Sequence, residues 1–172
     1  MLAFAPLCAL AVDAPKAVEP VKLADRIYTF SNTMANSTAI VGDESVILVD
    51  SGENPQAAAA LQAAIATLTP KPVRVLVNTH WHFDHANGNE ALGAAGVVVV
   101  AQKEVRPRMI AGKGLAVSPS FPTLAYDKAE LALPTVNFDR ELTLCSGDEE
   151  VQLVHPAAGS AHTDGDTVVY YR

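Results

Sequence analysis

The chain has 172 residues, of which 49% are hydrophobic and 18% charged, and its formal net charge at pH 7 is −7. A chain of this length and hydrophobic content buries one substantial core and has the size of a single domain. With 12 Lys and Arg against 19 Asp and Glu, it forms no basic face. This argues against a nucleic-acid or anionic-membrane partner and leaves a small-molecule substrate.

The first residues, Met1 to Val12, form an apolar run that small residues and prolines follow. This pattern favours a signal peptide with a linker over residues 1–21, and hence a periplasmic or secreted protein. No basic residue precedes Lys16, which favours the alternatives of a late start codon or a cytoplasmic protein. The run is too short to span a bilayer. Residues 22–172 are expected to form one domain.

Three short strands are predicted next, at 26–30, 37–41 and 45–49, because β-branched and alternating apolar residues are separated there by turn residues. They predict a β-meander. It ends at Asp50, for which two interpretations have about equal weight. Asp50 is either a hydrogen-bond acceptor beneath a functional site or a turn residue before Gly52.

Helix and strand patterns alternate in the middle of the chain. The alanine-rich segment 54–68 has apolar residues at helical spacing and a proline in its first turn, which predicts an amphipathic helix. Apolar runs at 73–77 and 97–101 predict buried strands, and a short helix is predicted between them at 89–95. Strand, helix and strand in this order imply a parallel crossover.

The segment 102–110 is predicted to be helical, and its two arginines are interpreted as solvated surface residues. The glycines, serines and prolines of 111–122 predict a long loop, with a flap over a functional site as the sharper interpretation and a mobile connection as the more common one. Phe121 and Tyr126 are the aromatic residues of this region that are placed to contact a substrate.

Histidines are concentrated in one stretch, because three of the five in the chain lie between His80 and His85. The stretch begins where the strand at 73–77 ends. In extended backbone, residues two apart point to the same side, so His80 and His82 present their rings to one point while Trp81 and Phe83 face apolar packing.

A second polar cluster, residues 161–166, contains His162 and follows a hairpin predicted from strands at 138–145 and 149–154. Imidazole nitrogen and carboxylate oxygen are ligands of zinc, which takes three protein ligands and a water in catalytic sites. His162 is the best-motivated third ligand beside the two histidines above. Asp84 and His85 would then begin a second metal site.

Other polar residues near these clusters receive simpler interpretations. His155 lies seven residues before His162 and is interpreted as structural or exposed. Asp164 and Asp166 are most simply turn and cap residues. Asp166 and Thr163 are also candidates for supporting the loop by hydrogen bonding.

The motif HWHFDH at 80–85 resembles the H-x-H-x-D-H signature of the metallo-β-lactamase superfamily. The later AHTDGD resembles the region that carries this family's third histidine. Asp50-Ser51-Gly52 and the residues after His85 are similar to the family's usual surroundings. The resemblance runs from about Ala24 to the end of the chain.

The resemblance implies an α/β fold, the first half to two-thirds of a four-layer αβ/βα sandwich. It implies that His80, His82 and His162 hold a first zinc, and that Asp84 and His85 hold a second. The bridging aspartate and last histidine of the family have no counterparts here, so the chain is expected to be a C-terminally truncated fragment.

The expected activity is hydrolysis of an ester, lactone, thioester or amide by a water that two zinc ions activate, with Asp84 orienting that water. One alternative is an iron-dependent oxygenase or oxidoreductase of the same superfamily, because histidine and carboxylate do not distinguish zinc from iron. A second alternative is a non-catalytic metal-binding module, which is favoured if the natural protein ends at Arg172. The family name alone assigns no β-lactam substrate.

Overall fold

The computed structural model describes residues 18–31, 34–112, 130–157 and 161–172. The predicted leader over 1–12, and Phe121 and Tyr126 with most of their loop, lie outside these ranges. Within the described ranges, no helix combines the length and hydropathy that crossing a membrane requires.

The larger sheet has seven strands that follow one another in sequence order. Neighbours are antiparallel from β1 to β4 and parallel from β4 to β7. The predicted meander and the predicted parallel crossover between the strands at 73–77 and 97–101 are therefore confirmed, and β1 extends the meander into residues predicted in part as linker. The strands are β1 (Pro20–Ala24), β2 (Ile27–Ser31), β3 (Asn36–Val41), β4 (Val46–Val49), β5 (Val73–Asn78), β6 (Val98–Gln102) and β7 (Val136–Phe138).

A second, antiparallel sheet is formed by β8 (Glu141–Ser146), β9 (Glu149–Val154) and β10 (Val168–Tyr171), in the order β10-β9-β8. The predicted hairpin is confirmed, but its first strand is corrected. Phe138 ends β7 in the larger sheet, and the chain then turns into the second sheet. Three consecutive charged residues, Asp139, Arg140 and Glu141, interrupt the apolar alternation at this corner, and the predicted strand ran across them.

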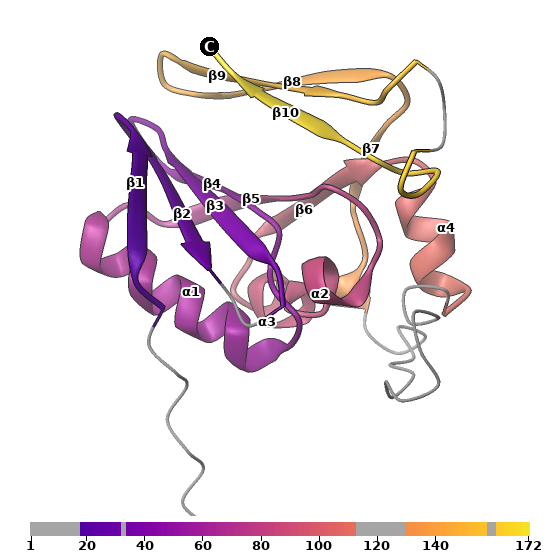
Figure 1. The fold of residues 1–172 in the computed structure, drawn as a ribbon, viewed down its shortest axis with the longest axis horizontal. Coiled ribbons are helices and arrows are strands. Elements are labelled where there is room, and N and C mark those ends of the chain that lie inside the picture. Colours follow the sequence, from indigo (N-terminus) through magenta and orange to yellow (C-terminus); the bar gives the residue numbers. More distant parts are fainter. Residues whose placement is uncertain (1–17, 32–33, 113–129, 158–160) are drawn as a thin grey trace, which may run out of the picture.

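Four α-helices and one 3-10 turn complete the described elements: α1 (Pro55–Leu68), α2 (Phe83–Ala86), α3 (Asn89–Ala94), α4 (Val105–Ile110) and η3 (Glu130–Ala132). Helix α1 begins as predicted, with Pro55 in its first turn and the Asn54 side chain accepting a hydrogen bond of 2.8 Å from the backbone N–H of Ala57. Helices α1 and α3 lie on one side of the larger sheet, and the second sheet lies on the other (Figure 1).

Alternate residues of β4 show why the larger sheet is covered on both faces. Val46 and Leu48 pack in the core on the helix side with Leu61 of α1, whereas Ile47 and Val49 pack in the core that includes residues of the second sheet. Helices, sheet and second sheet thus form successive layers, and the predicted α/β sandwich is confirmed.

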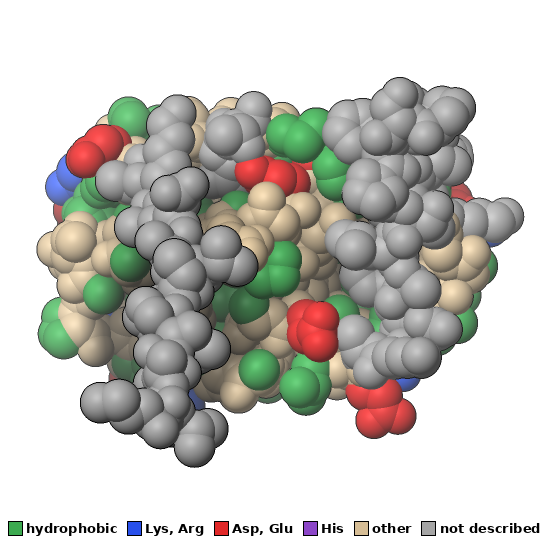
Figure 2. Space-filling model, turned by 90° about the horizontal axis from the view of Figure 1, so that it is seen from below, with side chains coloured by type: hydrophobic (Ala, Val, Ile, Leu, Met, Phe, Trp, Pro, Cys, Tyr) green, Lys and Arg blue, Asp and Glu red, His purple; other side chains and the backbone are tan. Residues whose placement is uncertain are grey.

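Seen from below, the helix side carries separate acidic side chains among hydrophobic and other ones, with Lys and Arg at its margins (Figure 2). The described residues that this view leaves uncovered form no basic patch. This agrees with the net charge of −7.

Candidate metal centre

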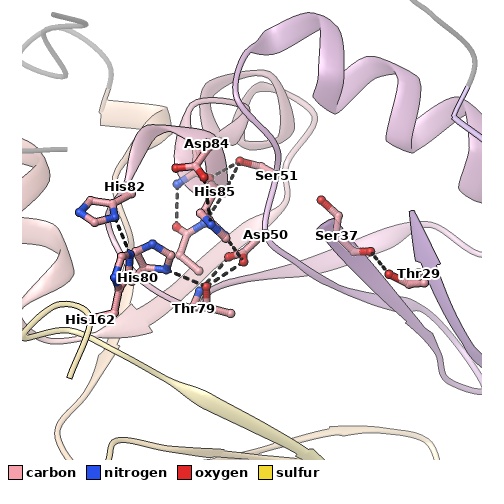
Figure 3. Close-up of polar contacts among 12 residues, drawn as sticks. Thr29, Ser37, Asp50, Ser51, Thr79, His80, His82, Asp84, His85 and His162 are labelled. Carbon is pink, nitrogen blue, oxygen red and sulfur yellow. Dashed lines mark hydrogen bonds and ion pairs between the residues drawn. The ribbon is translucent and has the colours of Figure 1, made fainter. Parts of the chain in front are cut away.

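The three predicted histidines come together at the carboxyl ends of the parallel strands. His80 and His82 follow β5, and His162 arrives from the loop between β9 and β10. The ring centroid of His80 lies 4.8 Å from that of His82 and 4.8 Å from that of His162, and the ring centroids of His82 and His162 lie 4.6 Å apart. The convergence expected from the sequence is therefore present in the structure (Figure 3).

The spacing of the ring nitrogens fits a small divalent ion. One nitrogen from each of the three histidines lies within 4.8 Å of the others, and Nδ1 of His82 is 2.9 Å from Nε2 of His162. Nitrogens bound to one tetrahedral zinc, each at about 2.0–2.1 Å, lie about 3.4 Å apart. The 2.9 Å separation is below this distance and the 4.8 Å limit is above it, so the three nitrogens lie in the range that one ion requires.

The hydrogen bonds of His80 determine which of its nitrogens is free. The Thr79 hydroxyl donates to Oδ2 of Asp50 at 2.8 Å, so its oxygen accepts the 3.0 Å hydrogen bond from Nδ1 of His80. Nε2 then carries the lone pair. Nε2 is buried and has no hydrogen-bond partner among the described residues. A buried acceptor left unpaired costs about 1–3 kcal/mol, and a bound ion removes this cost.

Burial keeps His80 and His82 in the form that binds a metal. Desolvation, helped by the neighbouring histidines His85, His82 and His162, lowers the pKa of His80 to about 3. Desolvation and the nearby His162 also lower the pKa of His82. Both rings are therefore neutral at neutral pH, with a lone pair available to a cation.

Asp84 and His85 form a pair beside this group, at the start of α2. Nε2 of His85 is 3.3 Å from Oδ2 of Asp84, and the His85 ring centroid is 4.1 Å from that of His80. Burial opposes a charge on His85, but its hydrogen bond to Asp50 and the charges of Asp50 and Asp84 outweigh burial and raise its pKa. The structure places this pair next to the three histidines, outside their cluster.

Asp50 connects both parts of the centre. It lies just after β4, is 3% exposed, and has a left-handed backbone with φ of 60°. Its carboxylate accepts hydrogen bonds from the Thr79 backbone at 2.8 Å, from the Thr79 hydroxyl, and from Nδ1 of His85 at 2.7 Å. Of the two interpretations of Asp50, the acceptor beneath the site is confirmed. Left-handed backbone at a residue other than glycine is strained and is typical of functional sites.

A buried amide network holds the segment that follows the motif, and the sequence analysis missed it. Ser51, Asn78 and Asn89 are all fully buried. The Ser51 hydroxyl donates to Oδ1 of Asn89 at 2.8 Å, and Nδ2 of Asn89 donates to Oδ1 of Asn78 at 2.7 Å. Gly88 allows the close approach, since a Cβ there would lie 2.3 Å from the Ser51 carbonyl oxygen. The signal was an Asn ending a buried strand followed by Asn87-Gly88-Asn89.

The His162 loop is stabilised from within by Asp166. Its carboxylate accepts hydrogen bonds from the backbone N–H of His162 at 2.7 Å and of Thr163 at 2.9 Å, and from the Thr163 hydroxyl. The expected support by Asp166 and Thr163 is confirmed. His155 is 9% exposed and donates from Nδ1 to the Asp166 carbonyl at 2.7 Å, so its interpretation as structural is confirmed too.

One prediction near the centre needs correction. The Arg108 side chain, interpreted as a solvated arginine, pairs with Asp164, which lies in a turn as predicted. Trp81 packs against a buried apolar cluster as predicted, but its indole Nε1 also donates to Asp164 at 3.2 Å. Arg108 and Asp164 are 56 positions apart in the sequence, so local patterns could not predict their contact.

A layered α/β fold with imidazoles gathered at one sheet edge is the arrangement of a metal-dependent hydrolase family. The family model described as "Metallo-beta-lactamase superfamily" matches residues 31–172. The chain therefore belongs to the metallo-β-lactamase superfamily, as its motif predicted.

Solved structures of this family are similar to the chain. MIM-2 metallo-β-lactamase gives a TM-score of 0.71 at 20% identity, covering 96% of this chain and 61% of that chain. BJP-1, a subclass B3 metallo-β-lactamase of Bradyrhizobium japonicum, gives 0.70 at 23% identity, covering 94% and 60%. A metallo-β-lactamase from Pontibacter korlensis gives 0.68 at 25% identity, covering 90% and 66%. These shares fit the predicted first half to two-thirds of the fold.

One curated relative has a different kind of name. The 2,4-dinitroanisole O-demethylase subunit alpha of Nocardioides sp. (strain JS1661) is 27% identical over 155 residues. The match covers 89% of this chain and 42% of that protein. The chain therefore spans less than half of this relative's length.

Proposed function

We propose that His80, His82 and His162 bind a divalent metal ion, that Asp84 and His85 offer ligands to a second, and that the protein is a metal-dependent hydrolase. The observation that carries the proposal is the buried, unpartnered Nε2 of His80 beside Nδ1 of His82 and Nε2 of His162. Zinc is the proposed ion, because it takes nitrogen and carboxylate ligands in catalytic sites.

A divalent ion held by His80, His82 and His162 would supply a bound water with a pKa of about 7 and would polarise a carbonyl group. The protein's own residues prepare the site for it. Thr79 fixes the tautomer of His80, and Asp50 fixes that of His85. The Asp84 carboxylate would accept a hydrogen bond from the attacking water and so orient it. Trp81 and the buried Phe83 would exclude bulk water from one side of the site.

The exposure of the three histidines indicates how a substrate enters. His80 is buried, His82 is half-buried and His162 is exposed. The centre is therefore open on the His162 side and closed beneath by Asp50. A small ester, lactone, thioester or amide reaches the ion from this open side.

A second candidate follows from the name of the curated relative. Loss of a methyl group from an aryl ether occurs either by oxidation of the methyl carbon or by displacement with water. Nitrogen and carboxylate ligands suit iron as well as zinc. An iron-dependent oxygenase or oxidoreductase is therefore the alternative, and oxygen uptake with substrate, together with iron in protein purified without added metal, would favour it over hydrolysis.

The main test compares His82→Ala with His155→Asn. His155→Asn is the matched control, because an asparagine retains a donor for the Asp166 carbonyl. The proposal predicts that His82→Ala loses bound metal and hydrolysis together, measured by elemental analysis and an ester, lactone, thioester and amide panel, while the control keeps both. Turnover by a metal-free His82→Ala protein would contradict the proposal. Metal binding without turnover of any panel member would favour the non-catalytic module.

A further inference from the structure

The position of the His162 loop decides whether the three imidazoles can meet. His80 and His82 extend from the larger sheet, whereas His162 belongs to a loop of the second sheet. Asp166 shapes this loop internally, and one backbone hydrogen bond of 2.7 Å, from Thr167 to the Thr79 carbonyl, joins it to the segment before His80. A further connection is needed to fix the side of the loop that carries His162.

Asp164 supplies this connection with both of its carboxylate oxygens. Oδ2 accepts hydrogen bonds from Nε of Arg108 at 2.9 Å and from its Nη2. Oδ1 accepts from Nε1 of Trp81 at 3.2 Å. Trp81 stands between His80 and His82 in the sequence, and its ring centroid is 4.6 Å from that of His82. One carboxylate, two residues from His162, therefore contacts both α4 and the other histidine segment.

The residues around this contact are buried and closely packed. Val105 and Met109 of α4 are fully buried, and Trp81 packs against their cluster. Gly165 lets the loop approach, since a Cβ there would lie 2.8 Å from Cγ2 of Val105 and 3.5 Å from Cδ1 of Trp81. Arg108 is thus held on a packed helix while its guanidinium reaches the loop.

We propose that Arg108 is a positioning residue of the metal centre, acting through Asp164 and Trp81 to set the spacing between His162 and the other two histidines. The inference rests on the metal site proposed above. Arg108 and Asp164 side chains are 36% and 31% exposed, so their ion pair adds little to folding stability. Its effect falls instead on metal affinity, because a loop held in place binds without the entropy loss of ordering.

The test is a Co²⁺ titration of the metal-free full chain, with the visible absorption of bound Co²⁺ reporting coordination geometry. Arg108→Ala is expected to weaken Co²⁺ binding about 10–100-fold, the range for residues that support metal ligands, and to change the absorption spectrum. Arg108→Lys, which keeps the charge but not the paired donors, is expected to fall between Arg108→Ala and the wild type. Arg74→Ala, at an exposed arginine of β5, is the control and is expected to bind as the wild type does.

The outcomes separate this inference from the function on which it rests. A wild-type chain that binds no Co²⁺ would overturn the metal site itself. A wild-type chain that binds Co²⁺, with Arg108→Ala equal to it in affinity and spectrum, would overturn the role of Arg108 alone. Equal losses in Arg108→Ala and Arg74→Ala would also overturn it, since the effect would then be one of net charge.

Discussion

Replacing Asp50 by asparagine tests the role of this buried hydrogen-bond acceptor beneath the metal centre. Asparagine has the same shape and tolerates left-handed backbone, so the turn after β4 is kept. The carboxylate accepts three hydrogen bonds, two from Thr79 and one from His85. An amide has one oxygen and one NH₂, so in either orientation its NH₂ faces at least one donor. The expected loss is about 2–3 kcal/mol of unfolding free energy.

For a chain of this length, that loss corresponds to a fall of about 4–12 °C in Tm. Without the Asp50 carboxylate, the tautomers of His85 and, through Thr79, of His80 are no longer fixed. Zn²⁺ binding is therefore also expected to weaken about 10–100-fold. Thermal unfolding of the metal-free protein and competition with a chelator measure the two effects separately. Asp139→Asn, the same change at an exposed carboxylate paired with Lys103 at 2.7 Å, is the control and is expected to change neither. An Asp50→Asn protein with wild-type Tm and Zn²⁺ affinity would refute this account of Asp50.

Four further predictions follow from the described contacts. Asn89→Ala leaves buried hydrogen-bond partners unpaired and is expected to lower the free energy of unfolding, measured in urea, by about 2–4 kcal/mol. Asn137→Ala, at an exposed position, is the control and should change it little. Equal effects of the two substitutions would argue against the buried network. Gly88→Ala pushes a Cβ against a carbonyl oxygen and is expected to lower Tm, so an unchanged Tm would show that the backbone there is free to move. The hydrogen bond from Arg26 lowers the pKa of Asp43 in the folded protein below its ordinary value of 3.8. The wild type is therefore expected to have a higher Tm than Asp43→Asn above pH 3.8, and this difference should vanish as the pH falls through the folded-state pKa. A difference in Tm that persists in stronger acid would contradict this. Removal of metal by a chelator is expected to lower Tm, and its return is expected to restore it. At a free metal concentration of 100 times Kd, the bound ion adds about 2.7 kcal/mol to the free energy of unfolding. A Tm that does not change with metal would count against binding to the folded state.

Local patterns in the sequence were sufficient for the histidine centre. His80 and His82 are two positions apart at the end of an apolar strand, and His162 follows a hairpin, so ligand chemistry and spacing predicted their convergence. The helix at α1 was equally clear, because its proline and its apolar spacing agree.

Contacts between distant residues were beyond what the sequence could show. The role of Asp50 depends on a left-handed turn and on the position of His85, and turn-forming aspartates before glycine are common. The Arg108–Asp164 pair depends on how α4 packs beside the loop of the second sheet. The corner after Phe138 falls on three charged residues, and the sheet that each flanking strand joins depends on packing. In each case tertiary packing, not local preference, determines the outcome.

Anomalous X-ray diffraction at the zinc absorption edge, from crystals of the chain grown with Zn²⁺, tests the central claim most directly. The account predicts an anomalous peak within bonding distance of Nε2 of His80, Nδ1 of His82 and Nε2 of His162. Zinc peaks elsewhere on the molecule with none among these three nitrogens would contradict it.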